Sequence, residues 1–149
     1  MSEISAIIED AFPYDDWRSK RQQYMKETHP ITEAISASAI TIAEEVDAKA
    51  IVCATISGYT ARQIAAHRPR TRIVAVSPTD STLRRLALTW GGECFTVPTF
   101  IDDEDMINKT MHQLKVGGLE PGDRIVLTGG VPFGQVGQTN MIRVVSIPE

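Results

Sequence analysis

The sequence predicts an α/β fold: a three-layer α/β/α sandwich around a mostly parallel five-stranded sheet, with an antiparallel edge strand at the C-terminus. Short apolar runs alternate with helical patterns, which is typical of parallel strands joined by crossover helices. The first run, Ala50–Ala54, is apolar without alternation, as in a strand covered on both faces. The link before the last run has no room for a full helix, so the last two strands should pair antiparallel.

Five strands and four main helices follow from the apolar spacing. The strands are expected at residues 50–54, 72–77, 94–97, 124–128 and 141–147. The helices are expected at about 31–45, 59–67, between Ser81 and Gly91, and at 102–115. In the third of these helices, Leu83, Leu86, Ala87 and Trp90 would form the apolar face. In the fourth, acidic residues stand at the positive end of the helix dipole.

The helix at Ile31–Glu45 has the strongest periodicity. Glu33 suits its first turn, where a carboxylate compensates the helix dipole. One face is predicted to pack on the sheet or on a partner subunit; its residues are Ile31, Ala34, Ile35, Ser38, Ala39, Ile42 and Val46.

Residues 1–29 are expected to lie outside the main domain, which would cover residues 30–149. An apolar helical stub at Met1–Asp10 is too short to be stable alone. The charged segment Trp17–Met25 is interpreted as either a mobile connector or a peripheral helix.

Composition excludes several classes of protein. A chain of 149 residues with 42% hydrophobic and 23% charged residues fits one globular domain. The net charge of -4 gives no electrostatic footprint for nucleic acid, and no apolar run is long enough to span a bilayer. The acidic start, Met1–Asp10, lacks the basic residues of a secretory signal. Cys53 and Cys94 lie in apolar runs, so we expect buried thiols in a reducing cytoplasm.

A candidate phosphate site follows the first strand. Thr55, Ser57 and Thr60 supply hydroxyl groups, and Gly58 lets the backbone approach a ligand closely. The helix that begins near Tyr59 would direct its amide groups and positive dipole end at the same point. The alternative is that Ser57 or Gly58 simply caps this helix.

A glycine-rich loop between the last two strands would reach the same edge of the sheet. It spans Gly129–Asn140 and contains Gly130, Gly134, Gly137 and Thr139. It carries no P-loop lysine and opens no helix, so neither a Walker A motif nor a dinucleotide fingerprint fits. We interpret it as either a flap of backbone amides over a phosphate or a hairpin loop rich in turn residues.

The sequence offers no catalytic set. Cys53 lies inside a strand, away from any helix N-terminus that would activate a nucleophile. The three histidines have no ligand spacing, and the run Asp102–Asp105 fits dipole compensation better than Mg²⁺ binding, so no metal site is predicted. These features describe a binding module better than an active site.

From about Thr32 to Ile147 the sequence resembles the C-terminal domain of pyruvate kinase. The matching segments, in the family's order and spacing, are Glu33–Ala39, Ala50–Arg62, Arg68–Arg70, Ile73–Val76, Leu86–Gly91, Gly122–Val126 and Gly137–Asn140. Leu88–Gly91 together with Phe95–Pro98 is similar to bacterial members. Ser2–Glu9 resembles the tail of the last helix of the family's (β/α)₈ barrel.

The resemblance implies a regulatory role in a glycolytic phosphotransferase, which converts phosphoenolpyruvate and ADP to pyruvate and ATP. The motifs of the catalytic barrel, with its Mg²⁺ and K⁺ sites, are missing here, so this chain alone is expected to be inactive and to hold no cofactor. In many members a sugar phosphate or nucleotide binds this domain. Its phosphate lies in the turn that matches Thr55, Ser57, Gly58, Tyr59 and Thr60, under the loop that matches Gly130–Thr139.

Departures from the family pattern narrow the effector. Members that respond to fructose 1,6-bisphosphate often carry basic residues where this chain has Ile56, Val131 and Asp102–Asp105. Acids near a second phosphate would repel it. We therefore expect a monophosphate effector, either a hexose phosphate or AMP.

The family's tetramer also implies subunit contacts, for which the helix Ile31–Glu45 and the strand Met141–Ile147 are the candidates. One alternative is a purely structural assembly module with a vestigial effector pocket. A second alternative is an independent small α/β enzyme for a phosphorylated substrate, which lacks support because no acid–base pair can be named.

Overall fold

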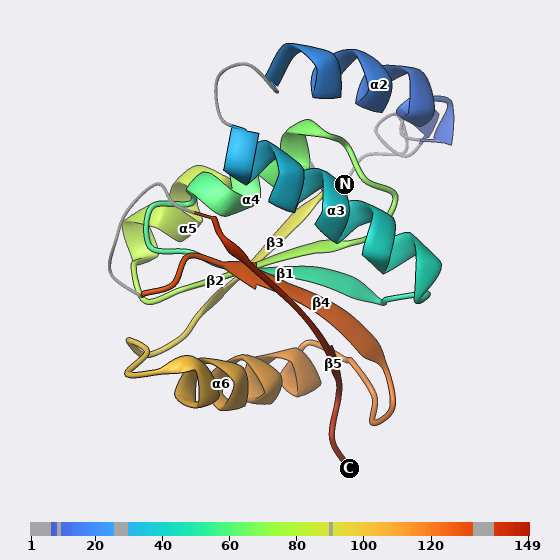
Figure 1. Ribbon diagram of the computed structural model, residues 1–149. Helices are drawn as coiled ribbons and strands as arrows, with labels where there is room; N and C mark the ends of the chain where they lie inside the picture. Colours follow the sequence, from blue (N-terminus) through green and yellow to red (C-terminus); the bar gives the residue numbers. More distant parts are fainter. Residues whose placement is uncertain (1–6, 9, 26–29, 90, 133–138) are drawn as a thin grey trace.

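The computed structural model describes residues 7–8, 10–25, 30–89, 91–132 and 139–149. Ten helices and strands follow in chain order within these residues (Figure 1). They are α2 (Tyr14–Met25), α3 (Pro30–Glu45), β1 (Ala50–Ala54), α4 (Tyr59–Ala66), β2 (Ile73–Ser77), α5 (Asp80–Leu86), β3 (Gly92–Thr96), α6 (Asp103–Val116), β4 (Arg124–Gly129) and β5 (Met141–Ser146).

The sheet has the strand order β3-β2-β1-β4-β5. Strands β1 to β4 are parallel, and β5 pairs antiparallel with β4 at the edge. Helices α3, α4 and α5 cover one face and α6 covers the other (Figure 1). The predicted three-layer sandwich with an antiparallel C-terminal edge strand is therefore confirmed.

Strand β1 lies at the centre, and all five of its residues are buried. Its side chains alternate between the two faces of the sheet, as a period of two requires. Ile51 and Cys53 join the apolar cluster that contains Ile40 of α3 and Ile64 of α4. Ala50, Val52 and Ala54 join the opposite cluster with Met106, Met111 and Leu114 of α6. A fully apolar strand is thus explained by a helix layer on each side.

Helix α5 is shorter than the sequence predicted. It ends at Leu86, and Ala87 is exposed, so the expected apolar face reduces to Leu83 and Leu86. Trp90 lies outside the described residues. The chain turns instead, with the Thr89 amide donating to the Leu86 carbonyl oxygen at 2.8 Å. Strand β3 then begins at Gly92, two residues before the predicted start.

The predicted face of α3 packs on the sheet only in part, and its exposed residues leave the predicted alternative of a partner subunit open. Ile31 is 68% exposed, Ala34 and Ser38 are exposed as well, and only Ala39 of the predicted face is fully buried. Ile35, Ile42 and Val46 are half-buried. The buried residues are Thr32, Glu33, Ser36, Ala39, Ile40 and Ala43. The face is displaced because the first two turns of α3 bury polar side chains, which apolar periodicity cannot detect.

Glu33 is buried rather than exposed in the first turn of α3. Its Oε1 lies 3.1 Å from Nε2 of the fully buried His67, which ends α4. Burial raises the pKa of the Glu33 carboxyl, and the positive charge of Arg21 partly opposes that rise. Glu33 lies in the first turn of α3, as predicted, and it also joins α3 to α4.

The segment before α3 contains a peripheral helix, α2, packed on the end of α4. The Trp17 indole Nε1 donates to the Ala66 carbonyl oxygen at 2.7 Å. The Arg68 guanidinium lies 4.7 Å from the Phe12 ring centroid and 5.3 Å from that of Trp17. Arg70 stacks in the same way on Tyr14, at 4.8 Å. The derivation of residues 1–29 from a barrel helix remains a prediction.

Candidate functional site

The predicted phosphate turn lies at the carboxyl end of the central strand. Strands β1, β2 and β4 run in the same direction, so the segments that follow them meet at one edge of the sheet. The Thr55 amide donates to the Val76 carbonyl oxygen of β2 at 3.0 Å. In open α/β sheets, ligands bind outside the carboxyl ends of the strands.

Two hydroxyl groups organise the turn from within. Thr55 Oγ1 accepts a hydrogen bond from the Gly58 amide at 2.9 Å, and Ser57 Oγ accepts a longer one from the Tyr59 amide at 3.3 Å. Gly58 is the N-cap of α4 and makes no side-chain cap bond. The Arg62 amide donates to the Gly58 carbonyl oxygen at 3.1 Å, which closes the first turn of the helix. The amides of Thr60 and Ala61 precede it, as expected in a first helical turn.

Gly58 is required at this position for two reasons. Its φ of +78° lies in the left-handed region. A Cβ atom there would also lie 3.1 Å from Cδ2 of Leu86 and 2.9 Å from Nη1 of Arg62. The tight turn therefore depends on the absence of a side chain.

Side chains from outside the turn bind two of its carbonyl groups. Thr82 Oγ1 of α5 donates to the Ile56 carbonyl oxygen at 2.8 Å, and Arg62 Nη1 donates to the Ser57 carbonyl oxygen at 3.1 Å. Arg85 Nη2 in turn donates to Thr82 Oγ1 at 3.3 Å. These contacts join the turn to α4 and α5.

The glycine loop is tied to the same helix. The Thr60 and Thr139 hydroxyl groups are 2.8 Å apart, and both residues are buried. The Asn140 side chain accepts from the Val131 amide at 2.8 Å and donates to the Val131 carbonyl oxygen at 2.7 Å, which joins the two ends of the loop. Gly130 opens the loop and is half-buried, whereas Gly134 and Gly137 lie outside the described residues.

The five predicted residues of the turn have different environments. Thr55 and Thr60 are buried, and their hydroxyl groups have partners within the protein. Ser57 and Tyr59 are only half-buried, so they have access to solvent at the turn. Sequence reasoning missed Arg62, which places a cation within contact of the turn. Its position four residues after Gly58, one helical turn on, was the available signal.

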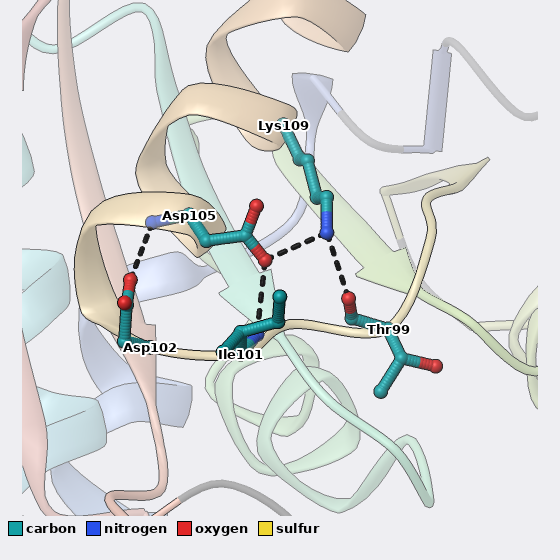
Figure 2. A network of polar contacts seen from close by, with 5 residues as sticks. All are labelled: Thr99, Ile101, Asp102, Asp105 and Lys109. Atoms are coloured by element: carbon teal, nitrogen blue, oxygen red, sulfur yellow. Dashed lines mark hydrogen bonds and ion pairs between the residues drawn. The ribbon is translucent and has the colours of Figure 1, made fainter.

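Two acids at the start of α6, Asp102 and Asp105, have hydrogen-bond partners within the protein (Figure 2). Asp102 caps the helix by accepting from the Asp105 amide at 2.8 Å. Asp105 Oδ2 accepts from the Ile101 amide at 2.9 Å and from Lys109 Nζ at 2.6 Å. The hydrogen bond from Lys109 holds the pKa of the Asp105 carboxyl below its usual range. Within the described residues no group of three or more His, Cys, Asp or Glu side chains is placed to hold a metal ion.

The two cysteines are free thiols. Burial raises the pKa of the Cys53 thiol to about 12, although a hydrogen bond with Thr128 works in the other direction. Burial also raises the pKa of Cys94, which is half-buried. A thiol with so high a pKa is a poor nucleophile at neutral pH. Across the described residues, no helix is long and apolar enough to cross a membrane.

Comparisons of the sequence and of the structure with known proteins point to the same family. Residues 33–145 match the family model described as "Pyruvate kinase, alpha/beta domain". The chain is 35% identical over 145 residues to the pyruvate kinase of Geobacillus stearothermophilus, with 97% of this chain and 24% of the relative covered. It is 31% identical to the pyruvate kinase of Clostridium acetobutylicum, with 97% of this chain and 30% of that relative covered.

Among solved structures, a pyruvate kinase from Cryptosporidium parvum superimposes with a TM-score of 0.80 at 26% identity, over 94% of this chain and 27% of that one. The same score is reached, at 25% identity, by a structure described as Cryptosporidium parvum pyruvate kinase in complex with ADP. The chain thus spans between 24% and 30% of the length of the two bacterial relatives named above.

Proposed function

The chain belongs to the pyruvate kinase family as its C-terminal α/β domain, and on that premise we propose that it is the regulatory part of a pyruvate kinase. It binds a phosphorylated effector at the turn between β1 and α4 and contributes to assembly of the oligomer. The phosphoryl transfer from phosphoenolpyruvate to ADP, with its Mg²⁺ and K⁺, belongs to a catalytic barrel outside this sequence. The proposed location is the cytoplasm, where glycolysis takes place.

The observation that carries the effector proposal is the start of α4. The helix begins at a glycine without a side-chain cap, and its first turn contains no acidic residue. The positive end of the helix dipole and the first-turn amides attract an anion there. Ser57 and Tyr59 have access to solvent beside it, and Arg62 adds a full positive charge. Thr139 of the glycine loop reaches the same helix through Thr60, so the loop can close over a bound phosphate.

The surroundings favour a monophosphate, such as a hexose phosphate or AMP. Ile56 in the turn and Val131 in the loop offer no positive charge to a second phosphate. A bisphosphate would therefore gain little from its additional charge. An Ile56→Arg substitution should strengthen binding of every phosphate compound, and unchanged affinity would count against the site.

A second role, subunit assembly, is favoured by apolar exposure on α3 and β5. Ile31 of α3 is 68% exposed and lies beside the exposed Ala34 and Ser38. Val144 on the edge strand is 44% exposed, and no strand of the described residues pairs with the outer side of β5. An open strand edge is a surface for pairing with another chain. If the effector pocket is vestigial, assembly would be the whole function.

A thermal-shift titration separates these roles. The chain is titrated with glucose 6-phosphate, AMP, fructose 1,6-bisphosphate and inorganic phosphate. Saturating a real site at about 100 times Kd should add about 2.7 kcal/mol to the free energy of unfolding, visible as a higher Tm. Ser57→Ala should reduce the shift, whereas Ser146→Ala on β5 serves as the matched control and should leave it unchanged.

Failure of all four compounds to raise Tm would contradict the effector proposal and leave the assembly role. Size-exclusion chromatography with light scattering tests assembly independently. A phosphoenolpyruvate–ADP assay on this chain should read zero, and clear turnover would overturn both roles.

A further inference from the structure

The hydroxyl of Thr60, one of the predicted phosphate ligands, already has a partner within the protein. Thr60 is the second residue of α4 and therefore lies in its first turn, close to the proposed effector site. Its Oγ1 lies 2.8 Å from Thr139 Oγ1, which is a hydrogen bond between two side chains far apart in the sequence. The two residues are only 3% and 1% exposed. A ligand that binds the Thr60 hydroxyl must therefore compete with Thr139 for it.

The register of the sheet brings Thr139 to this position. Ala54, the last residue of β1, pairs with Gly129 of β4, and Gly129 pairs in turn with the first residue of β5. The two strands lie close together here, since a Cβ atom on Gly129 would lie 3.2 Å from the Ala54 carbonyl oxygen. The Asn140 amide donates to the Gly129 carbonyl oxygen at 3.1 Å. Thr139 is the preceding residue, so backbone pairing positions it against the start of α4.

The hydrogen bond between Thr60 and Thr139 joins two neutral groups. A hydroxyl has one proton to donate and two lone pairs that accept, and either residue can be the donor in this pair. Hydrogen bonds to an ionised acceptor are roughly twice as strong as those between neutral groups. A phosphate oxygen is therefore a better partner for Thr60 than Thr139 is. The hydroxyl of an unphosphorylated sugar would only exchange one neutral partner for another.

We propose that Thr139 is an internal competitor of the effector: its hydroxyl holds Thr60 in the free domain, and a phosphate oxygen replaces it on binding. This inference rests on the proposed effector function and adds a means of regulation to that site. The competition sets a threshold that a phosphorylated compound passes and its unphosphorylated form does not. It also lowers the affinity for the effector, because part of the binding free energy is used to break the bond between Thr60 and Thr139. Thr139 thus determines both the selectivity and the affinity of the site.

Isothermal titration calorimetry tests this competition. The chain is titrated with glucose 6-phosphate and with AMP, and glucose and adenosine are the uncharged controls. Thr139→Val keeps the shape of the side chain and removes its hydroxyl, so the affinity for the bound phosphate compound should rise about two- to tenfold, the effect of one net neutral hydrogen bond. Thr60→Val removes the phosphate ligand itself and should lower the affinity. Glucose and adenosine should give no saturable heat.

Thr110→Val is the matched control. Thr110 is as deeply buried as Thr139, but it lies on α6, which covers the opposite face of the sheet from α4. This substitution should leave the affinity unchanged. Circular dichroism checks that every variant is folded at the temperature of the titration. Thr139→Ser keeps the hydroxyl and should bind like the parent, and Thr139→Ala replaces Thr139→Val in the comparison if the valine variant does not fold.

The outcomes separate this inference from the effector proposal. If the parent binds a phosphate compound and Thr139→Val binds it equally or more weakly, Thr139 does not compete and the inference is overturned, while the effector site stands. Equal binding of glucose and glucose 6-phosphate would overturn the inference as well. Absence of saturable binding in both the parent and Thr139→Val would overturn the effector proposal itself. Binding that appears only in Thr139→Val would support the competition.

Discussion

Helices α4 and α6 both begin at the carboxyl edge of the sheet, on opposite faces, yet their first turns are completed in different ways. Helix α6 is capped by Asp102, and Asp105 within its first turn is bound to Lys109 (Figure 2). Helix α4 begins at Gly58 without a side-chain cap and has no acid in its first turn. The start of α6 therefore contains its own carboxylates, whereas the first turn of α4 contains none.

The difference shows why acidic residues at a helix start are poor evidence for a metal site, and why their absence is informative. A carboxylate near the first-turn amides interacts favourably with the positive end of the helix dipole and so stabilises the helix. The first turn of α4 contains no carboxylate, so the dipole at this end of the helix is not compensated by an acid of its own. The regulatory role proposed for this domain depends on that difference, and the variants described below test it.

The largest expected effect is at Gly58. Gly58→Ala adds left-handed strain of about 1–2 kcal/mol and crowding against Leu86 of about 1–3 kcal/mol. Gly118→Ala is the matched control, because Gly118 has a similar φ of +88° but nothing within 4 Å of its Cβ position. Urea denaturation should therefore find a greater loss of stability at Gly58 than at Gly118. Equal losses would mean that the close packing of the turn against Leu86 contributes nothing.

The next effect concerns the hydroxyl pair that joins α4 to the glycine loop. Thr60→Val or Thr139→Val leaves one buried hydroxyl without its partner and should cost about 1–3 kcal/mol in the free energy of unfolding. The double variant removes both hydroxyls and should cost clearly less than the sum. A double-mutant cycle by chemical denaturation measures this coupling, and strict additivity would show that the pair is not linked.

A smaller effect separates the two helix starts. Asp102→Ala should destabilise the protein by about 1 kcal/mol, the usual cost of a lost N-cap. Ser57→Ala removes only a long 3.3 Å bond, so its stability cost should be below about 0.5 kcal/mol. The opposite pattern is expected for effector affinity, which should fall for Ser57→Ala alone. Thermal unfolding without glucose 6-phosphate measures the stability of each variant, and unfolding with the ligand measures its effector affinity. If both variants lost stability and affinity to the same extent, the distinction between the two helix starts would be wrong.

The smallest effect is a pH dependence that comes from Asp105 of α6. The pKa of Asp105 is lowered from 3.8 in the folded state, so the unfolded chain binds more protons as pH falls through this range. Stability from Asp105 is therefore present above about pH 3.8 and is lost below it. Glu33, whose pKa is raised from 4.5, acts with the opposite sign and in a higher window. Lys109→Met should flatten the loss of Tm in acid, and an unchanged slope would exclude the ion pair as its source.

The positions of the helices and strands were predictable because apolar spacing encodes them directly. The buried face of α3 was not, because Glu33 is buried against His67, and a polar pair from distant segments leaves no periodic signal. For the proposed effector turn between β1 and α4, the sequence pattern predicted five residues. It did not reveal that the Thr55 and Thr60 hydroxyls are used inside the protein.

The contribution of Thr82 to the turn depends on how α5 packs, which only the tertiary structure gives. Arg62 was within reach of sequence reasoning, because residues one helical turn apart share a face. The expected roles of Gly134 and Gly137 remain predictions, since both lie outside the described residues.

The most direct test of the account is amide chemical-shift mapping of the ¹⁵N-labelled chain during titration with glucose 6-phosphate. We expect saturable shifts of the Ser57, Gly58, Tyr59, Thr60 and Ala61 amides at the start of α4, and we expect the amides of Asp102–Met106 at the start of α6 to stay unchanged. Shifts confined to the α6 end, or none at the α4 end at saturating ligand, would contradict the claim that the uncapped helix is the effector site.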